Sequence, residues 1–258
     1  MALNARVTSW AGRRCWLVGA SSGIGAALAR SLGARGARLA LSSRRREPLE
    51  ALARELGGDT RVAPFDATQP GATARAHAEL LAAWGEVDLV MYLAGDYVAR
   101  RAWELDMAEA RKIVDVNLMG ALELVAAVVP GLAQRRGGAI AIVSSVAGYG
   151  GLPNGLVYGA TKAALINLCE TLYLDLAPRG VGVHLVMPGF VRTPLTAQNR
   201  FPMPFLIEPE EAARQIVLGL ERGAFEIHFP KAFSRMLKAL GLLPYSLYFR
   251  AVRRATGL

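Results

Sequence analysis

The chain has 258 residues, of which 53% are hydrophobic, and a formal net charge of +9. No uninterrupted apolar run reaches the roughly 18 residues of a membrane-spanning helix, and the first residues do not have the pattern of a signal peptide. Six cationic side chains and no acidic one follow Glu226, so the positive and negative charges in the rest of the chain nearly balance. This balance argues against a nucleic-acid-binding protein.

Short apolar runs alternate with helical patterns along the chain. Strands are expected at residues 15–18, 37–42, 60–65, 87–93, 139–143, 181–186 and 225–229. Helices are expected from Ile24, over residues 48–56, 72–84 and 107–134, from near Tyr158 to Leu176, and over 209–222. Continuous apolar strands between helices predict one doubly wound α/β domain over residues 1–229, with a parallel sheet of about seven strands and helices on both faces. Residues 230–258 form a basic tail that Pro244 divides into two amphipathic helices.

The two cysteines are too few for a disulfide framework. Cys15 lies in an expected buried strand and Cys169 on an expected helix. Both are therefore expected to be core residues in a reducing compartment, which predicts a cytoplasmic location.

A glycine-rich turn, Gly19-Ala20-Ser21-Ser22-Gly23-Ile24-Gly25, joins the first strand to the first helix. In a dinucleotide-binding fold such a turn lets the backbone approach a pyrophosphate, and the helix N-terminus supplies free N–H groups. Taken alone, the turn is equally consistent with tight packing between a strand and a helix. Its place after the first strand favours phosphate binding.

The second strand ends in a basic segment. Ser42-Ser43-Arg44-Arg45-Arg46 contains no acid before Glu47. An acid at this place would bind both ribose hydroxyls of NAD, whereas arginine accommodates a 2′-phosphate, so the segment predicts a preference for NADP(H). The alternative is a solvated helix start, although positive charge is unfavourable there. Asp66, after the third strand, is placed either to bind an adenine amine or to cap a helix.

The segment from Ala139 to Lys162 contains the candidate catalytic residues. Ser145 follows a strand, while Tyr158 and Lys162 are four residues apart on a helix and share one face. An ammonium beside a phenol is expected to lower the tyrosine pKa, so that Tyr158 can exchange a proton with a substrate oxygen. The alternative is a surface tyrosine one turn from a lysine.

With Ala94-Gly95, Asn117 and Pro188-Gly189, these motifs resemble the short-chain dehydrogenase/reductase family from Arg14 to Phe229, in family order and spacing. The resemblance implies a Rossmann-like fold, Tyr158 as general acid/base, and Lys162 lowering its pKa and holding the nicotinamide ribose. It also implies that Ser145 polarises the carbonyl and that Asn117, at a helix kink, holds a water. The implied cofactor-binding residues are Gly19, Ser21, Ser22, Gly23, Ile24, Gly25, Ser43, Arg44, Asp66, Ala94, Gly95, Tyr158, Lys162, Pro188, Gly189, Val191 and Thr193. No metal site is expected.

The chain departs from the family at two neighbouring places. Val18 stands where the family usually has threonine, and Tyr92-Leu93 stands where it usually has Asn-Asn. Because both sides of a polar contact become apolar, the change predicts a repacked sheet end rather than an inactive enzyme.

The expected substrate lid, residues 195–207, is largely apolar, and Tyr149, Leu152 and Val157 are expected to line the opposite wall. Such a pocket favours a lipophilic ketone, aldehyde or secondary alcohol, unless these residues only pack the lid closed. The predicted activity is that of an NADP(H)-dependent carbonyl reductase or alcohol dehydrogenase. The alternatives are a 3-oxoacyl-carrier-protein reductase and a non-catalytic NADP(H) sensor or scaffold.

The basic tail has three interpretations. It could form an oligomer or lid contact, an amphipathic anchor at a membrane surface, or a dock for an acidic carrier protein. The family resemblance itself implies a homodimer or homotetramer.

Overall fold

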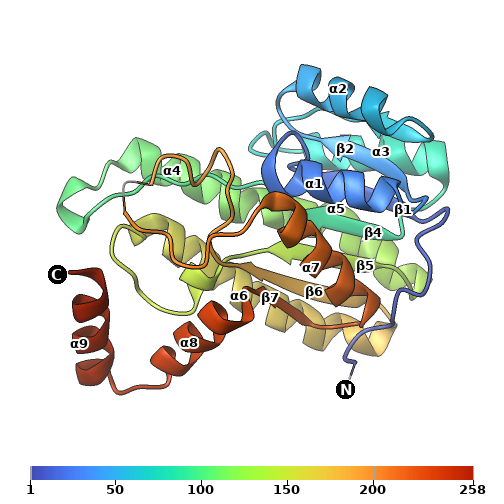
Figure 1. Cartoon of the computed structure of the whole chain (residues 1–258). Helices are drawn as coiled ribbons and strands as arrows, with labels where there is room; N and C mark the ends of the chain where they lie inside the picture. Colours follow the sequence, from blue (N-terminus) through green and yellow to red (C-terminus); the bar gives the residue numbers. More distant parts are fainter. Residues whose placement is uncertain (1, 200, 258) are drawn as a thin grey trace.

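Seven parallel strands form the sheet in a computed structural model that describes residues 2–199 and 201–257 (Figure 1). The strands follow the order β3-β2-β1-β4-β5-β6-β7. Their bounds are β1 Arg14–Val18, β2 Arg38–Ser42, β3 Thr60–Val62, β4 Leu89–Tyr92, β5 Ala139–Val143, β6 Gly182–Pro188 and β7 Glu226–Phe229. The predicted fold class is therefore confirmed. Of the segments discussed above, Met1, the lid residue Arg200 and the tail residue Leu258 lie outside the described residues.

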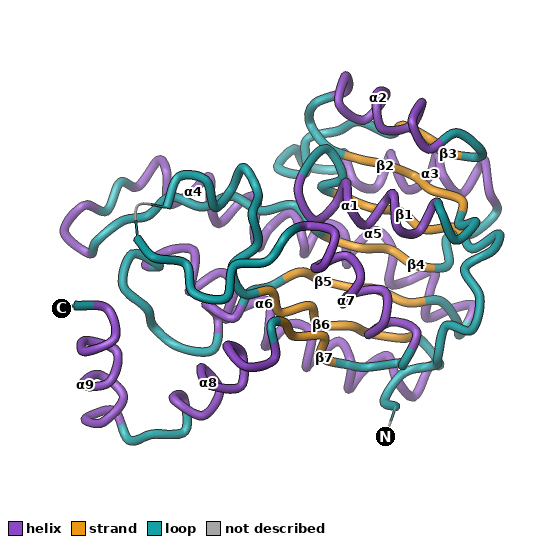
Figure 2. Tube along the Cα trace, in the orientation of Figure 1, coloured by secondary structure: helices purple, strands orange, loops and turns teal. Residues whose placement is uncertain are grey.

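Helices cover both faces of the sheet (Figure 2). The helices are α1 Gly23–Gly33, α2 Arg46–Leu56, α3 Ala72–Trp84, α4 Met107–Val114, α5 Gly120–Arg135, α6 Leu156–Leu176, α7 Pro209–Glu221, α8 Lys231–Gly241 and α9 Tyr245–Thr256. One buried cluster joins α1, α2 and α7 to the sheet, and a second joins α3, α5 and α6 to its other face.

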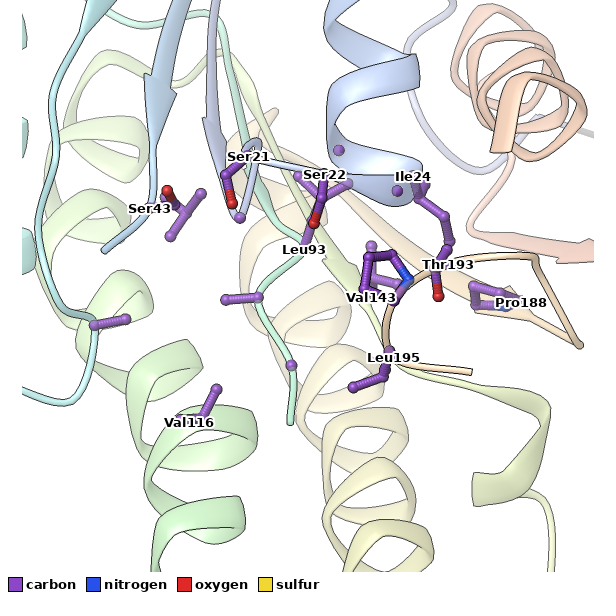
Figure 3. A pocket seen from close by; sticks show the side chains of 18 of the residues that line it. Ser21, Ser22, Ile24, Ser43, Leu93, Val116, Val143, Pro188, Thr193 and Leu195 are labelled. Atoms are coloured by element: carbon purple, nitrogen blue, oxygen red, sulfur yellow. The ribbon is translucent and has the colours of Figure 1, made fainter. Parts of the chain in front are cut away.

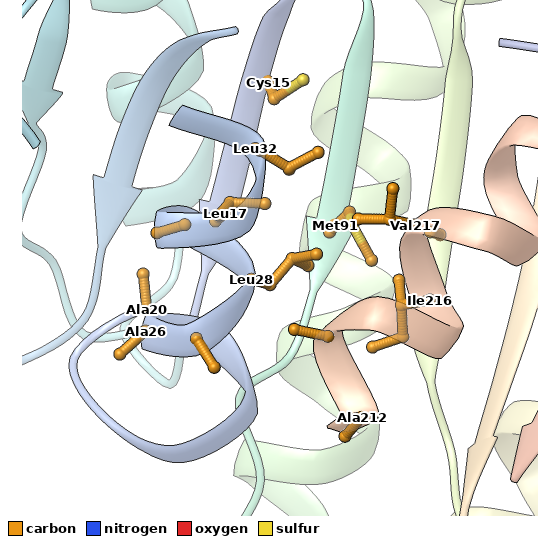
Figure 4. Close-up of a cluster of buried hydrophobic side chains, with 14 of the residues drawn as sticks. Cys15, Leu17, Ala20, Ala26, Leu28, Leu32, Met91, Ala212, Ile216 and Val217 are labelled. Carbon is orange, nitrogen blue, oxygen red and sulfur yellow. The ribbon is translucent and has the colours of Figure 1, made fainter. Parts of the chain in front are cut away.

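Alternation along the strands assigns each side chain to one of these two cores. Cys15 and Leu17 of β1 join Leu28, Leu32 and residues of α7 (Figure 4), whereas Trp16 of β1 faces the other core. Cys169 is also fully buried, on α6, and both cysteines are free thiols, as expected of small core residues.

The chain reverses its direction of winding between β1 and β4. From β1 it proceeds outward through β2 and β3, then returns to place β4 on the other side of β1, with Val18 opposite Tyr92. In a parallel sheet of this kind, a ligand binds outside the carboxyl ends of the strands at the point of reversal. The topology therefore predicts a ligand-binding site at the end of the sheet where Val18 and Tyr92 lie.

Three predicted boundaries differ from the structure. The third strand ends at Val62, although Ala63 N and Phe65 N still donate to Leu41 O and Ser43 O of the segment that begins in β2. Helix α2 begins at Arg46 rather than Pro48, because a proline in the first turn of a helix removes no needed donor. The expected long helix is interrupted by a π-helical segment, Asp115–Met119, between α4 and α5.

The combined helix from Met107 to Arg135 is long and apolar enough to cross a membrane by length and composition alone. Asn117 and Glu123 interrupt its apolar residues, so the sequence contains no continuous apolar run of spanning length there. In this fold α5 packs against α3, and α4 and the π segment pack against α6. These contacts bury 39% of its apolar window.

Candidate active site

A cavity of about 670 Å³ opens at the carboxyl ends of the central strands (Figure 3). Its volume is within the range of small-molecule and cofactor sites. Apart from Asn117, every residue predicted to be catalytic or cofactor-binding lines this one cavity. Residues far apart in the sequence thus meet at the place that the sheet topology indicates.

The glycine-rich turn passes very close to other backbone. A Cβ on Gly25 would lie 2.2 Å from the Gly19 carbonyl oxygen, and one on Gly19 would lie 2.5 Å from the Ala94 nitrogen. Tight packing thus requires both glycines. The same turn lines the cavity, and Ser22 places no side-chain cap on the N-terminus of α1, whose described first turn carries no acidic residue. Tight packing of the turn and phosphate binding are therefore compatible. The closely packed turn leaves an uncapped helix end that fits a pyrophosphate.

Two arginines border the far end of the cavity. Arg44 and Arg45 are exposed and line it, with Arg45 Nη2 3.4 Å from the hydroxyl oxygen of Ser21. From the sequence, Arg44 was named as a cofactor-binding residue but Arg45 was not, although both belong to the run of three arginines that indicated a 2′-phosphate site. Arg46 belongs instead to α2, where it pairs with Glu50 at 3.4 Å.

Asp66 lines the cavity and does not cap a helix. Its Oδ1 accepts hydrogen bonds from the backbone N and the hydroxyl of Thr68, at 2.9 and 2.8 Å. Helix α3 begins six residues beyond Asp66, after Gly71. Asp66 therefore orders a turn on the cavity wall, where a carboxylate can accept from an adenine amine.

The candidate catalytic residues share one wall. Ser145 follows β5, and its hydroxyl accepts from Ala147 N at 3.1 Å and donates to Pro188 O at 3.4 Å. Tyr158 and Lys162 lie one turn apart on α6, with Lys162 Nζ 5.5 Å from the centre of the Tyr158 ring. Lys162 is 3% exposed and donates to Val143 O at 3.0 Å.

The pKa values differ from the expectation that Lys162 draws Tyr158 toward ionisation. Burial raises the pKa of Tyr158 to about 12, and the neighbouring Ser145 hydroxyl only partly offsets this. Burial also lowers the pKa of Lys162 to about 8. The expected lowering of the Tyr158 pKa was therefore wrong for the protein without cofactor. The Lys162 ammonium lies over the Tyr158 ring, and burial disfavours both the phenolate and the ammonium.

Tyr97 is a contact that sequence reasoning missed. Its ring meets Tyr158 edge to face, with centroids 4.9 Å apart, and its carbonyl accepts from Gln198 Nε2 of the lid at 2.6 Å. No motif marked this residue, because it lies in an irregular segment after β4.

Asn117 lies behind the cavity wall, in the π-helical segment where the family resemblance implied a kink. It is fully buried; its Oδ1 accepts from Asp96 N at 2.7 Å, and its Nδ2 donates to Asp96 O and Thr161 Oγ1 at 3.0 Å each. These contacts hold the segment next to Gly95 in place. The water-holding role expected for Asn117 stays a prediction.

The departures from the family pattern form a repacked sheet end. Tyr92 is fully buried, and its hydroxyl donates to Val116 O of the π segment at 2.5 Å. A Cβ on residue 120 would lie 2.1 Å from that hydroxyl, so the tyrosine requires Gly120. Leu93 lines the cavity, and its N–H donates to Val18 O at 2.7 Å. Tyr92 thus connects β4 to the segment that carries Asn117.

We expect Tyr92→Phe to lower the free energy of unfolding by about 1–3 kcal/mol, because a buried carbonyl loses its donor. Urea unfolding measures this change. Tyr173→Phe is the matched control, since the Tyr173 hydroxyl donates to Leu3 O at 2.9 Å at the surface. Equal losses of unfolding free energy in the two variants would show that the buried Tyr92 hydrogen bond stabilises the protein no more than the surface one does.

The substrate wall differs from the prediction. Tyr149 and Leu152 do not line the main cavity; they line a smaller one beneath α8 and α9, and Val157 lines neither. The Tyr149 hydroxyl instead donates to Glu226 at 2.5 Å. Leu195 and Thr196 of the lid do reach the main cavity, as does Pro194 just before it.

Comparison with known proteins identifies close relatives of this chain. The family model described as short chain dehydrogenase matches residues 14–203. An uncharacterized oxidoreductase of Myxococcus xanthus (strain DK1622) is 38% identical over 245 residues, covering 94% of this chain and 97% of the relative. A short-chain dehydrogenase from Sphingobium yanoikuyae in complex with NADPH has a TM-score of 0.80 and 28% identity, covering 88% of this chain and 92% of the other. An alcohol dehydrogenase from the archaeon Thermococcus sibiricus, complexed with 5-hydroxy-NADP, has a TM-score of 0.77 and 27% identity, covering 84% and 95%.

Proposed function

Because this chain belongs to the short-chain dehydrogenase family, we propose that it is an NADP(H)-dependent oxidoreductase that interconverts a ketone or aldehyde and an alcohol. The observation that carries the proposal is that Ser145, Tyr158 and Lys162 line the same cavity as the glycine-rich turn. A sensor that only bound the cofactor would not need a tyrosine and a serine hydroxyl at the inner end of its binding site.

Each of the three residues has a role that follows from its position. Tyr158 gives a proton to the substrate oxygen in reduction and takes it back in oxidation. The Ser145 hydroxyl donates to the same oxygen and stabilises the charge that develops there. Lys162, buried one turn from Tyr158 on α6, holds the nicotinamide ribose hydroxyls. A bound nicotinamide would supply or accept the hydride.

The fit of the cofactor rests on the chain's own residues. The uncapped N-terminus of α1 suits the pyrophosphate, and Asp66 suits the adenine. Arg44 and Arg45 suit a 2′-phosphate, because no acidic side chain precedes Glu47 at the end of β2. The relatives solved with NADPH and with 5-hydroxy-NADP are consistent with this preference.

We expect the double variant Arg44→Ala/Arg45→Ala to bind NADPH roughly 10–100-fold more weakly and NADH within a few-fold of the wild type. A hydrogen bond to a charged group is worth about 1.5–3 kcal/mol, and NADH lacks the 2′-phosphate. Fluorescence titration of both cofactors measures the effect. Arg46→Ala is the control, since Arg46 pairs with Glu50 on α2. Equal weakening for both cofactors would contradict recognition of the phosphate.

The substrate is proposed to be lipophilic. Leu195 and Pro194 bring apolar surface to the cavity. Phe201 and Phe205 of the lid form an aromatic cluster with Phe190 and with Phe233 of α8. This favours long-chain or cyclic ketones over small hydroxy acids and sugars. The homo-oligomeric assembly and the cytoplasmic location stay predictions.

A further inference from the structure

The C-terminal helices α8 and α9 extend from β7 past the carboxyl ends of the strands (Figure 1). One face of α9 is attached to the body of the protein. Tyr248 is buried and its hydroxyl donates to Gly151 O at 2.8 Å, while Val252 is buried one turn later. Gly150 leaves room for the tyrosine, because a Cβ there would lie 2.7 Å from its hydroxyl. The orientation of α9 is therefore defined by packing.

The outward side of the same segment is apolar. Leu242 is 86% exposed, Tyr245 79% and Phe249 54%. The rings of Tyr245 and Phe249 stack with centroids 5.6 Å apart, so they present one continuous aromatic surface. Single exposed apolar residues are ordinary, but a large cluster beside cations marks an interaction surface.

The charges around this surface have one sign. No acidic residue follows Glu226 in the sequence, and Glu226 itself is occupied by Lys238 and by Tyr149. Arg250, Arg253 and Arg254 form no ion pair with any carboxylate among residues 2–199 and 201–257. Three cations are therefore available to an external anionic partner.

We propose that α8 and α9 form a docking surface for an anionic lipid bilayer. Leu242, Tyr245 and Phe249 would enter the interfacial region, and the arginines would contact lipid phosphates. A bilayer can bind both the exposed apolar side chains and the arginines, because its hydrocarbon region lies directly beneath a layer of negatively charged headgroups. A second copy is disfavoured, since a two-fold contact between tails would bring arginines together without an acid on either side. An acidic protein would satisfy the charge but gives no reason for aromatic rings exposed to this extent.

This surface adjoins the lid of the proposed active site. Phe233 of α8 stacks on Phe205 of the lid and on Phe190, which precedes the lid, with centroids 5.8 and 5.6 Å apart. The segment Tyr149–Gly151, on which α9 rests, leads into the helix that carries Tyr158. A bilayer at α9 would therefore lie next to elements that border the substrate cavity. Lipid binding at this surface does not depend on any catalytic activity.

The test is co-sedimentation of the full chain with phosphatidylcholine vesicles that contain or lack phosphatidylglycerol. We expect binding only to the anionic vesicles, weakened by salt. Each cation near an anionic surface contributes roughly a fivefold gain in partitioning. Arg250→Gln/Arg253→Gln/Arg254→Gln should therefore bind at least about tenfold more weakly. Leu242→Ser/Phe249→Ser should weaken binding similarly, because it removes the apolar contact.

The control, Arg6→Gln/Arg54→Gln/Arg179→Gln, loses the same charge at exposed positions outside the tail and should bind as the wild type does. Circular dichroism verifies that each variant is folded, and sedimentation velocity without vesicles gives its mass. Equal binding of the tail and control variants would overturn the proposal, as would no binding by the wild type. If only the tail variants changed the mass, with no vesicle binding by the wild type, the surface would be a contact between copies instead.

Discussion

Tyr158→Phe is expected to lower kcat for ketone reduction with NADPH about 10²–10⁴-fold, the range that a positioned general acid contributes. The variant keeps the ring, and with it the contacts to Tyr97 at 4.9 Å and to Lys162 at 5.5 Å. It loses only the hydroxyl that can protonate the substrate oxygen. The effect on kcat should therefore far exceed any effect on NADPH affinity.

The measurement is NADPH oxidation over a panel of long-chain, cyclic and small polar ketones, with NADPH binding followed separately. Tyr97→Phe is the matched control, since its hydroxyl lies on the residue packed against Tyr158 but is assigned no proton transfer. Similar losses in both variants would refute the acid/base assignment. NADPH binding without turnover of any ketone by the wild type would favour the non-catalytic sensor. Preference for the small polar ketones would refute the lipophilic substrate.

The architecture and the position of the site followed from local patterns. Continuous apolar strands predicted the parallel sheet, and the four-residue spacing of Tyr158 and Lys162 predicted their proximity on one helix face. The glycine-rich turn was placed correctly because its spacing follows directly from the end of the first strand. These features depend on residues close together in the sequence.

The properties that the sequence did not predict depend on distant segments. The pKa of Tyr158 is raised first by burial, and the distant residue Tyr97 raises it further. Tyr149 turns toward Glu226, a residue 77 positions away, rather than toward the substrate. The contact of Tyr92 with the π segment likewise could not be inferred, since no local pattern predicts which carbonyl a buried hydroxyl will reach.

Lys162→Met is expected to stabilise the folded protein near neutral pH while abolishing activity. Burial lowers the pKa of Lys162 from 10.5 to about 8, so below pH 8 the folded state holds a charged group that burial disfavours. At 1.36 kcal/mol per unit, this cost is roughly 3 kcal/mol. Loss of the hydrogen bond to Val143 O offsets about 1 kcal/mol. The variant should therefore gain about 2 kcal/mol at pH 7.

The sign of the pH dependence distinguishes this cause from simple repacking. Between pH 8 and 10.5 the unfolded lysine keeps its proton and the folded one has lost it, so wild-type stability rises relative to that of the variant. The advantage of Lys162→Met should shrink over this window and vanish or reverse at its upper end. Urea unfolding across the window measures the difference, with Lys112→Met as control, because that side chain is 59% exposed and forms a surface pair with Asp96. Parallel stability curves for Lys162→Met and the wild type would mean that folded and unfolded Lys162 hold the proton equally strongly, and burial of a charged amine would then not be the cause of any gain in stability.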